Sequence, residues 1–214
     1  MTYLDIVNGV LRRLREDEVS TVNQSTYSKM VGDFVNDAKR LVEDAWSWSG
    51  LRRTLQVQTT IGTFQYSLVG SMNRGKILDV VNVDEDYFLD YQTAHWFNNQ
   101  FLNNNPVDGS PYVYSYNGVD ENGDTVVDVY PIPDTVKTIN FNMVLPQDDL
   151  TDDSTRLLVP AQPVLHLALA MLARERGETG GTSTAEYFAI ADRHLSDAIA
   201  LDASKHPEEV VWYS

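Results

Sequence analysis

Four histidines, His95, His166, His194 and His206, are the residues that could carry acid–base or metal chemistry. No two of them have the His-x-x-x-His spacing or another spacing typical of metal ligands, so the sequence gives a metal centre little support. His166 lies in an apolar segment, where a buried, hydrogen-bonded histidine is favoured over a catalytic or metal-binding one. We therefore predict no metal and no cofactor.

Two short segments have the composition of ligand-binding loops. Residues 177–183, Gly-Glu-Thr-Gly-Gly-Thr-Ser, precede a predicted helix, where backbone amides can bind phosphate. They lack a Gly-Lys-Ser/Thr ending and follow a helix, which favours a plain helix–helix turn. Residues 120–124, Asp-Glu-Asn-Gly-Asp, resemble a calcium loop, but the glycine is fourth instead of sixth and no glutamate is twelfth. The Asn-Gly pair there favours a hairpin turn.

Carboxylates are the remaining candidates for catalysis. One cluster, Asp148, Asp149, Asp152 and Asp153, could bind a divalent ion, although a solvated linker is favoured. The sequence cannot show that any carboxylate pair is buried with a raised pKa, as a glycosidase acid requires. The absence of cysteine excludes disulfides, thiolate zinc sites and a cysteine nucleophile, and Gly-x-Ser-x-Gly is absent too. We find no catalytic constellation above background and predict that the protein is not an enzyme.

Helical periodicity dominates both ends of the sequence. Thr2 can cap a short first helix, with Asp5 three residues on. From Ser25 to Trp46 apolar residues follow a 3.6-residue period, with Lys39, Arg40, Glu43 and Asp44 on the opposite face. Pro160 and Pro163 suit the start of a third helix that is apolar almost all round and ends at Gly177, and a last helix follows.

A period of two replaces the helical pattern in the middle of the chain. Residues 55–61, 64–68, 76–83, 112–116, 126–130 and 138–144 have the composition of strands, and residues 91–102 that of a short helix. The sequence thus predicts an α+β fold, in which a helical bundle from the N- and C-terminal segments is split by an inserted, mainly antiparallel β module. We place the bundle in residues 1–50 and 156–205, the module in 51–155 and a C-terminal arm in 206–214.

The net charge of the 214 residues is −15, from 31 acidic and 16 basic residues. Residues 77–155 contain fifteen acids and one base, so the sequence places nearly all of the net charge in the β module. Such an acidic surface argues against tight nucleic-acid binding. No window approaches the roughly 20 apolar residues of a bilayer span, and no signal peptide is recognisable, so we expect a soluble, cytoplasmic and uncleaved chain.

Apolar side chains at exposed positions predict contact surfaces. An apolar run beyond the last helix gains little unless it docks on something, and an over-apolar helix suits subunit packing. The predicted partner-binding residues are Val210, Val211, Trp212 and Tyr213 of the arm, Leu165, Leu169 and Leu172 of the apolar helix, and Trp96, Phe97 and Phe101 of the module helix.

Three segments together resemble a known family. They are Thr2-Tyr3-Leu4-Asp5-Ile6-Val7-Asn8 with Leu11-Arg12-Arg13-Leu14, the long helix ending Ala45-Trp46-Ser47-Trp48, and Leu51-Arg52-Arg53-Thr54 leading to Tyr66-Ser67-Leu68. This pattern is similar to head-to-tail adaptors of short-tailed bacteriophages, also called tail tubular protein A or the connector. The resemblance covers about half of the chain, most clearly residues 1–68 and the closing helix pair.

The resemblance implies a structural virion protein that assembles as a dodecameric ring between the portal and the tail nozzle. Genomic DNA would pass through the lumen during ejection without specific binding. It implies a location in the neck or tail of the virion after assembly in the host cytoplasm, and no membrane. Two alternatives remain: a tail-associated carbohydrate hydrolase that uses acids of the β module, and a soluble acidic, chaperone-like binding module.

Overall fold

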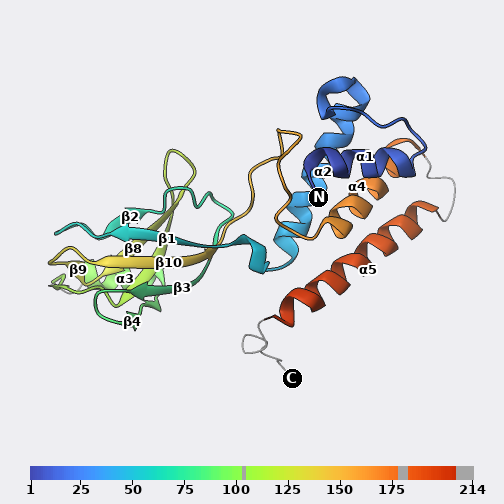
Figure 1. Ribbon diagram of the computed structural model, residues 1–214. Helices are drawn as coiled ribbons and strands as arrows, with labels where there is room; N and C mark the ends of the chain where they lie inside the picture. Colours follow the sequence, from blue (N-terminus) through green and yellow to red (C-terminus); the bar gives the residue numbers. More distant parts are fainter. Residues whose placement is uncertain (103–104, 178–182, 206–214) are drawn as a thin grey trace. The chain divides into compact units, whose positions relative to one another are not determined.

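Two compact units form the chain, and Figure 1 shows the elements of each. The computed structural model describes residues 1–102, 105–177 and 183–205. The helical unit combines Met1–Leu51 with Gln147–Ser214, and the β unit is the continuous segment Arg52–Pro146. This arrangement confirms the predicted α+β fold with a β module inserted into a helical bundle.

The helical unit contains four α-helices, within the described residues, and two short 3₁₀ turns. Thr2 caps α1 (Tyr3–Arg13): its hydroxyl accepts from the Asp5 amide at 3.2 Å, and its own amide donates to the Asp5 carboxylate at 2.9 Å. Ser25 caps α2 (Thr26–Ala45) in the same reciprocal way with Ser28. Both predicted starts are confirmed. The other elements are η1 (Val22–Gln24), η2 (Ser49–Leu51), α4 (Ala161–Glu175) and α5 (Ser183–Ala203).

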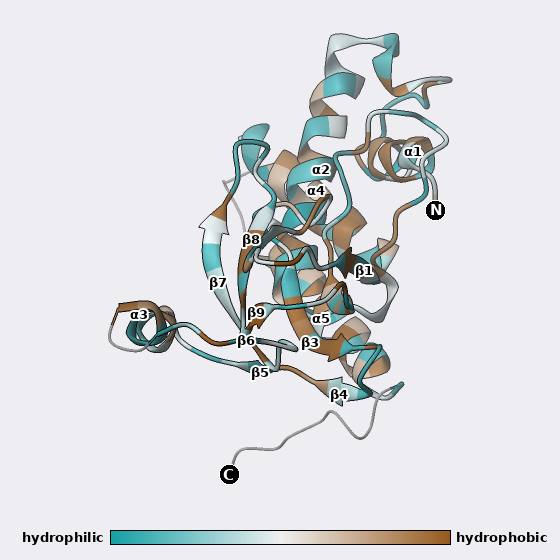
Figure 2. Cartoon of the chain, turned by 90° about the vertical axis from the view of Figure 1, so that its left-hand side faces the viewer, coloured by the Kyte–Doolittle hydropathy of each residue, from teal (hydrophilic) through white to brown (hydrophobic). Residues whose placement is uncertain are grey.

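Helix α4 forms the centre of the helical unit, because it packs against α1, α2 and α5. Figure 2 colours much of α1 and α4 as hydrophobic. Gly9 on α1 permits close approach to α4, since a Cβ atom there would lie 2.8 Å from Cδ1 of Leu165. Helix α4 begins after Pro160, and Gly177 follows its end with φ of +74°, a conformation that favours glycine. The prediction of an apolar helix covered on several sides is confirmed.

Two four-stranded sheets form the β unit. One has the order β1-β10-β3-β4 and the other β2-β8-β7-β5; a short parallel pair, β6-β9, accompanies them. The strands are β1 (Arg52–Gln58), β2 (Gln65–Ser67), β3 (Lys76–Asn82), β4 (Tyr87–Phe88), β5 (Asp90–Tyr91), β6 (Asp108–Gly109), β7 (Val113–Val119), β8 (Thr125–Tyr130), β9 (Ile132–Pro133) and β10 (Thr138–Val144). Most pairings are antiparallel, and β5 with β7 is a parallel exception.

A single apolar cluster joins the two sheets. It takes Ile139, Phe141 and Met143 from β10 and Val127 and Val129 from β8, which alternate along their strands as a half-buried face requires. The predicted hairpin between β7 and β8 is confirmed. Its Asp120 carboxylate accepts from the Asn122 amide at 2.8 Å and the Asp124 amide at 3.0 Å.

Helix α3 (Ala94–Leu102) packs on the second sheet. Phe97 is buried with Val113 and Tyr130, and Trp96 and Phe101 pack against this cluster while half-exposed. Edge-to-face contacts hold the rings, as between Trp96 and Tyr130, whose centroids are 5.6 Å apart. The predicted module helix therefore exists, and it uses its aromatic residues to cover the sheet.

The unit boundary changes the distribution of charge. Residues 147–155, which we assigned to the β module, group with the helical unit because their backbone is hydrogen-bonded to α2, as at Leu150. With this boundary the β unit has eleven acidic and five basic residues, a net charge of −6. The helical unit has twenty acidic and eleven basic residues, a net charge of −9. The prediction that the β module carries nearly all of the net charge is therefore wrong.

Candidate functional site: two polar clasps in the helical unit

Two groups of polar contacts in the helical unit bind the segments that lead into and out of the β unit. We call the first the return clasp: Asn36, Lys39, Arg40 and Glu43 of α2 with residues 147–150. We call the second the exit clasp: Asp202 and Lys205 at the end of α5 with Trp46 and Ser49. Both clasps lie within the helical unit.

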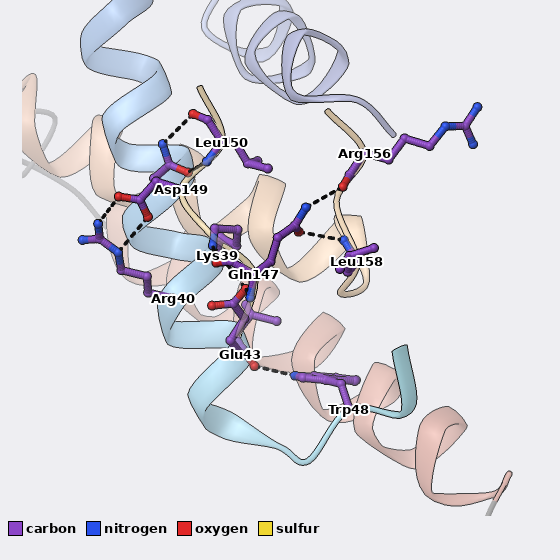
Figure 3. Close-up of polar contacts among 11 residues, drawn as sticks. Lys39, Arg40, Glu43, Trp48, Gln147, Asp149, Leu150, Arg156 and Leu158 are labelled. Atoms are coloured by element: carbon purple, nitrogen blue, oxygen red, sulfur yellow. Dashed lines mark hydrogen bonds and ion pairs between the residues drawn. The ribbon is translucent and has the colours of Figure 1, made fainter. Parts of the chain in front are cut away.

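A buried ion pair forms the centre of the return clasp (Figure 3). The Lys39 ammonium donates to Oε1 of Glu43 at 3.2 Å and to the Gln147 carbonyl at 2.5 Å. The Gln147 amide donates in turn to the same Glu43 oxygen at 3.1 Å. Because the Lys39 and Glu43 side chains are 0% and 1% exposed, they lock the backbone of Gln147 onto α2 with little competition from water.

The two charges depend on each other. Placing each ion in a protein interior costs several kcal/mol, which only good geometry and further hydrogen bonds offset. The Gln147 carbonyl and amide supply those bonds, one to each partner. A pair of this kind is weak evidence for added stability but a strong constraint on conformation, because displacing Gln147 would leave two buried charges undersatisfied.

Further bonds continue the return clasp along the segment. Asn36 makes a reciprocal pair with the Leu150 backbone, donating at 3.1 Å and accepting at 2.8 Å. Arg40 binds the Asp149 carboxylate through two nitrogens, and this contact raises the pKa of the Arg40 guanidinium. The Gln147 side chain bridges to the backbone of Arg156 and Leu158, at 2.8 and 3.1 Å. The segment is thus held at successive residues.

The sequence interpretation of this face of α2 was wrong for two residues. We placed Lys39 and Glu43 on the polar face opposite the apolar stripe, yet both are buried. Residues 147–150, more than a hundred positions away, cover that face, and no local pattern shows this. The available signal was the i, i+4 spacing of a lysine and a glutamate, which also occurs on solvated helices.

The exit clasp is built around the Asp202 carboxylate, which is 6% exposed. It accepts from the Ser49 amide at 2.9 Å, the Ser49 hydroxyl at 2.5 Å, the Trp46 indole at 3.3 Å and the Lys205 ammonium at 3.0 Å. Burial raises the pKa of Asp202, but the bonds from Ser49 and Lys205 outweigh it, so the pKa is lowered. Sequence analysis did not find this site.

Trp48 fixes the segment that follows α2 within the helical unit. Its side chain is 1% exposed, and its indole donates to the Val42 carbonyl at 2.6 Å (Figure 3). A rigid aromatic side chain thereby replaces the missing intrahelical partner of a carbonyl near the end of α2.

The polar groups of the clasps are arranged to hold backbone. The Lys39 ammonium and the Asp202 carboxylate are buried and hydrogen-bonded to protein groups, an arrangement that suits positioning of the backbone. In the described part of the chain no group of three or more histidine, aspartate or glutamate side chains could hold a metal ion. Asp149, Asp152 and Asp153 bind protein groups, as when Asp153 accepts from the Val22 amide at 3.0 Å.

Two histidines come together between α4 and α5. The rings of His166 and His194 stack with centroids 4.4 Å apart and an interplanar angle of 15°. Burial, together with the positive potential of His194 and Arg13, lowers the pKa of His166. The sequence predicted a buried histidine at position 166; its side chain is half-buried, and the stack on His194 was not foreseen.

The predicted partner-binding residues have different locations. Leu165, Leu169 and Leu172 are at most 4% exposed and form part of the interior of the helical unit. Phe97 is buried against the sheet, whereas the side chains of Trp96 and Phe101 remain partly exposed to solvent. Val210, Val211, Trp212 and Tyr213 lie outside the described residues. Across residues 1–102, 105–177 and 183–205, no helix combines the length and apolar content needed to cross a membrane.

Comparison with known proteins identifies the family. A family model described as the SU10 adaptor protein matches residues 1–210, which span both units. The chain therefore belongs to this family and is a phage structural adaptor-type protein of the virion. A search of curated proteins found no match. The match supports the phage adaptor part of the resemblance, does not specify a tail tubular protein of a short-tailed phage, and lends no support to the hydrolase alternative.

Proposed function

Starting from membership of the SU10 adaptor protein family, we propose that this chain forms a dodecameric ring between the portal and the tail nozzle of a short-tailed phage. In this proposal genomic DNA passes through the lumen during ejection without specific binding. The ring assembles in the host cytoplasm, and its work is mechanical, without catalysis or a cofactor.

The observation that carries the proposal is the family match over both units, together with the two clasps inside the helical unit. The return clasp fixes Gln147, the residue directly after the β unit, and the exit clasp fixes Ser49, three residues before it. Both connections are thereby anchored.

The acidity of both units suits a DNA conduit. Net charges of −9 and −6 favour repulsion of phosphate over adhesion, so duplex DNA would slide past instead of binding. Screening limits this effect to side chains within about 8 Å of the DNA at physiological salt.

The contacts of the ring are proposed to come from the surface of the β unit and from the arm, residues 206–214. Exposed apolar side chains such as Phe88 (68%) and Leu102 (82%) are available in the β unit. Val210, Val211, Trp212 and Tyr213 add an apolar run in the arm. Closed cyclic symmetry repeats each heterologous contact around the ring, which makes weak contacts effective.

The test measures mass by light scattering for the purified chain, alone and with portal. We expect a ring-sized complex with portal, and its loss when Val210, Val211, Trp212 and Tyr213 are all replaced by serine. The matched control replaces His206 and Pro207 by serine and keeps both glutamates and the apolar run. A wild-type chain that stays monomeric with portal would contradict the ring, and a serine variant that assembles normally would contradict the role of the arm.

A further inference from the structure

Strand β1 has one edge that no other strand covers among the described residues. The amide of Thr59 donates to the Lys137 carbonyl at 2.8 Å. The backbone N–H and C=O groups of the odd-numbered residues of β1 therefore point toward β10. Antiparallel pairing alternates, and the backbone groups of Thr54 and Gln56 therefore point away from β10. This edge presents a row of backbone donors and acceptors.

The open edge of β1 is less protected than the other sheet edges. Natural edge strands are short, bulged, interrupted by proline, or charged, most often with lysine. The other sheet edges follow this rule, since β2, β4 and β5 have only two or three residues. Strand β1 has seven residues, no proline, and continuous register from Arg52 opposite Val144 to Gln58 opposite Thr138. Its two charges, Arg52 and Arg53, lie at one end, so the stretch from Thr54 to Gln58 is an uncharged edge that can accept a strand.

The two faces of β1 indicate what such a strand would need. Leu55 and Val57 pack against the apolar core but remain half-exposed at its margin. On the other face, Thr54 donates to Asn142 at 2.6 Å and Gln56 to Asn140 at 3.2 Å. An added strand with apolar side chains on one face would complete the cover of Leu55 and Val57.

We propose that residues 208–213 of a second copy of this chain add to the edge of β1 as a further strand. The segment reads Glu-Glu-Val-Val-Trp-Tyr, four of whose residues favour strands, and it has no proline. A parallel alignment places Glu208 and Glu209 beside Arg52 and Arg53, which gives charge complementarity. The same alignment sets Val211 and Tyr213 beside Leu55 and Val57.

This inference rests on the proposed function, in which copies of the chain are neighbours in a ring. Strand addition from one copy to the next is a heterologous contact, which cyclic symmetry can close. Backbone hydrogen bonds supply the affinity, and the side chains fix the register.

The absence of cysteine allows a direct test by disulfide cross-linking in the full chain. Two single variants, Thr54→Cys and Val210→Cys, are mixed and oxidised with and without portal, so that a cross-linked pair must join two different chains. A disulfide requires Cα atoms within about 7 Å, a separation that neighbouring strands provide. Val136→Cys, which is 61% exposed in the same unit, replaces Thr54→Cys in the control. We expect at least about tenfold more cross-linked dimer than in that control.

A second variant tests the backbone edge itself. Gln56→Pro removes an amide that points away from β10, so it leaves the β1–β10 ladder intact and blocks an incoming strand. Gln56→Thr is the matched control, with the same loss of the Gln56 side chain. We expect proline to reduce the Thr54–Val210 cross-link about tenfold relative to threonine, while the two variants unfold at similar urea concentrations.

The outcomes separate this inference from the proposed function. Rings with portal but no Thr54–Val210 cross-link, or no difference between proline and threonine at position 56, would overturn strand addition and leave the adaptor function intact. A cross-link without rings would support strand addition and contradict the ring. A cross-link found only when both cysteines are in one chain would overturn the second copy as the source of the strand.

Discussion

The helical unit and the β unit are stabilised in contrasting ways. The helical unit places ions and hydrogen-bonded side chains in its interior, as at Lys39, Glu43 and Asp202. The β unit has an apolar cluster between two sheets, and it displays apolar residues outside: of eighteen large apolar side chains exposed in the described residues, thirteen belong to it. The unit with the smaller net charge therefore has more of the exposed large apolar side chains.

This contrast changes where contacts should be sought. From the sequence we assigned part of the subunit packing to the apolar helix that the structure defines as α4, whose leucines are enclosed within the helical unit. The surface of the β unit, including Phe88 and Leu102, has the exposed apolar residues that a partner can cover. We infer that the helical unit supplies rigidity and the β unit supplies contact.

The largest expected effect comes from placing one charged residue in each unit and comparing the loss of stability. Leu165→Asp buries a carboxylate at a position that is 1% exposed and should cost more than about 4 kcal/mol of unfolding free energy. Phe88→Asp, at a position that is 68% exposed, should change it by less than about 0.5 kcal/mol. Urea unfolding measures both. If Leu165→Asp kept its stability and lost only assembly, α4 would be a contact surface after all.

Lys39→Met tests the buried ion pair of the helical unit. Removing the ammonium takes the buried ion partner away from the Glu43 carboxylate and should cost about 3–5 kcal/mol in urea unfolding. The double variant Lys39→Met, Glu43→Leu should recover part of that loss, because it removes the buried carboxylate as well. Lys29→Met, at an exposed position on the same helix, is the control. Equal stability of the Lys39 and Lys29 variants would show that the pair does not hold the return segment.

The smallest effect should appear on acidification. The pKa of His166 is lowered in the folded protein from its usual 6.5, so the unfolded chain takes up this proton first. Stability of the helical unit should therefore fall as the pH drops through 6.5, until the lower folded pKa is passed. His166→Asn should flatten this dependence of the urea midpoint, whereas His95→Gln, at an exposed position in the β unit, should not. A steep dependence that persists in His166→Asn would assign it to other groups.

Local chemistry made much of the fold predictable. Thr2 with Asp5, the apolar stripe from Ser25, the glycine after α4 and the Asn122-Gly123 turn act over a few residues, and each appears in the structure. The two-residue strands β4, β5, β6 and β9 are too short to establish a period. The clasps could not be predicted, because Lys39 meets Gln147 and Ser49 meets Asp202 across more than a hundred residues.

The same long separation in sequence determines the order in which the two units can fold during translation. The β unit is one uninterrupted stretch, so it can fold as soon as Pro146 has left the ribosome. Helix α4, the centre of the helical unit, is synthesised later, and until it emerges α1 and α2 can pack only on each other and on η1. A nascent chain would thus carry a folded β unit beside an incomplete helical unit, and the arm that we propose to bind the next copy would be synthesised last.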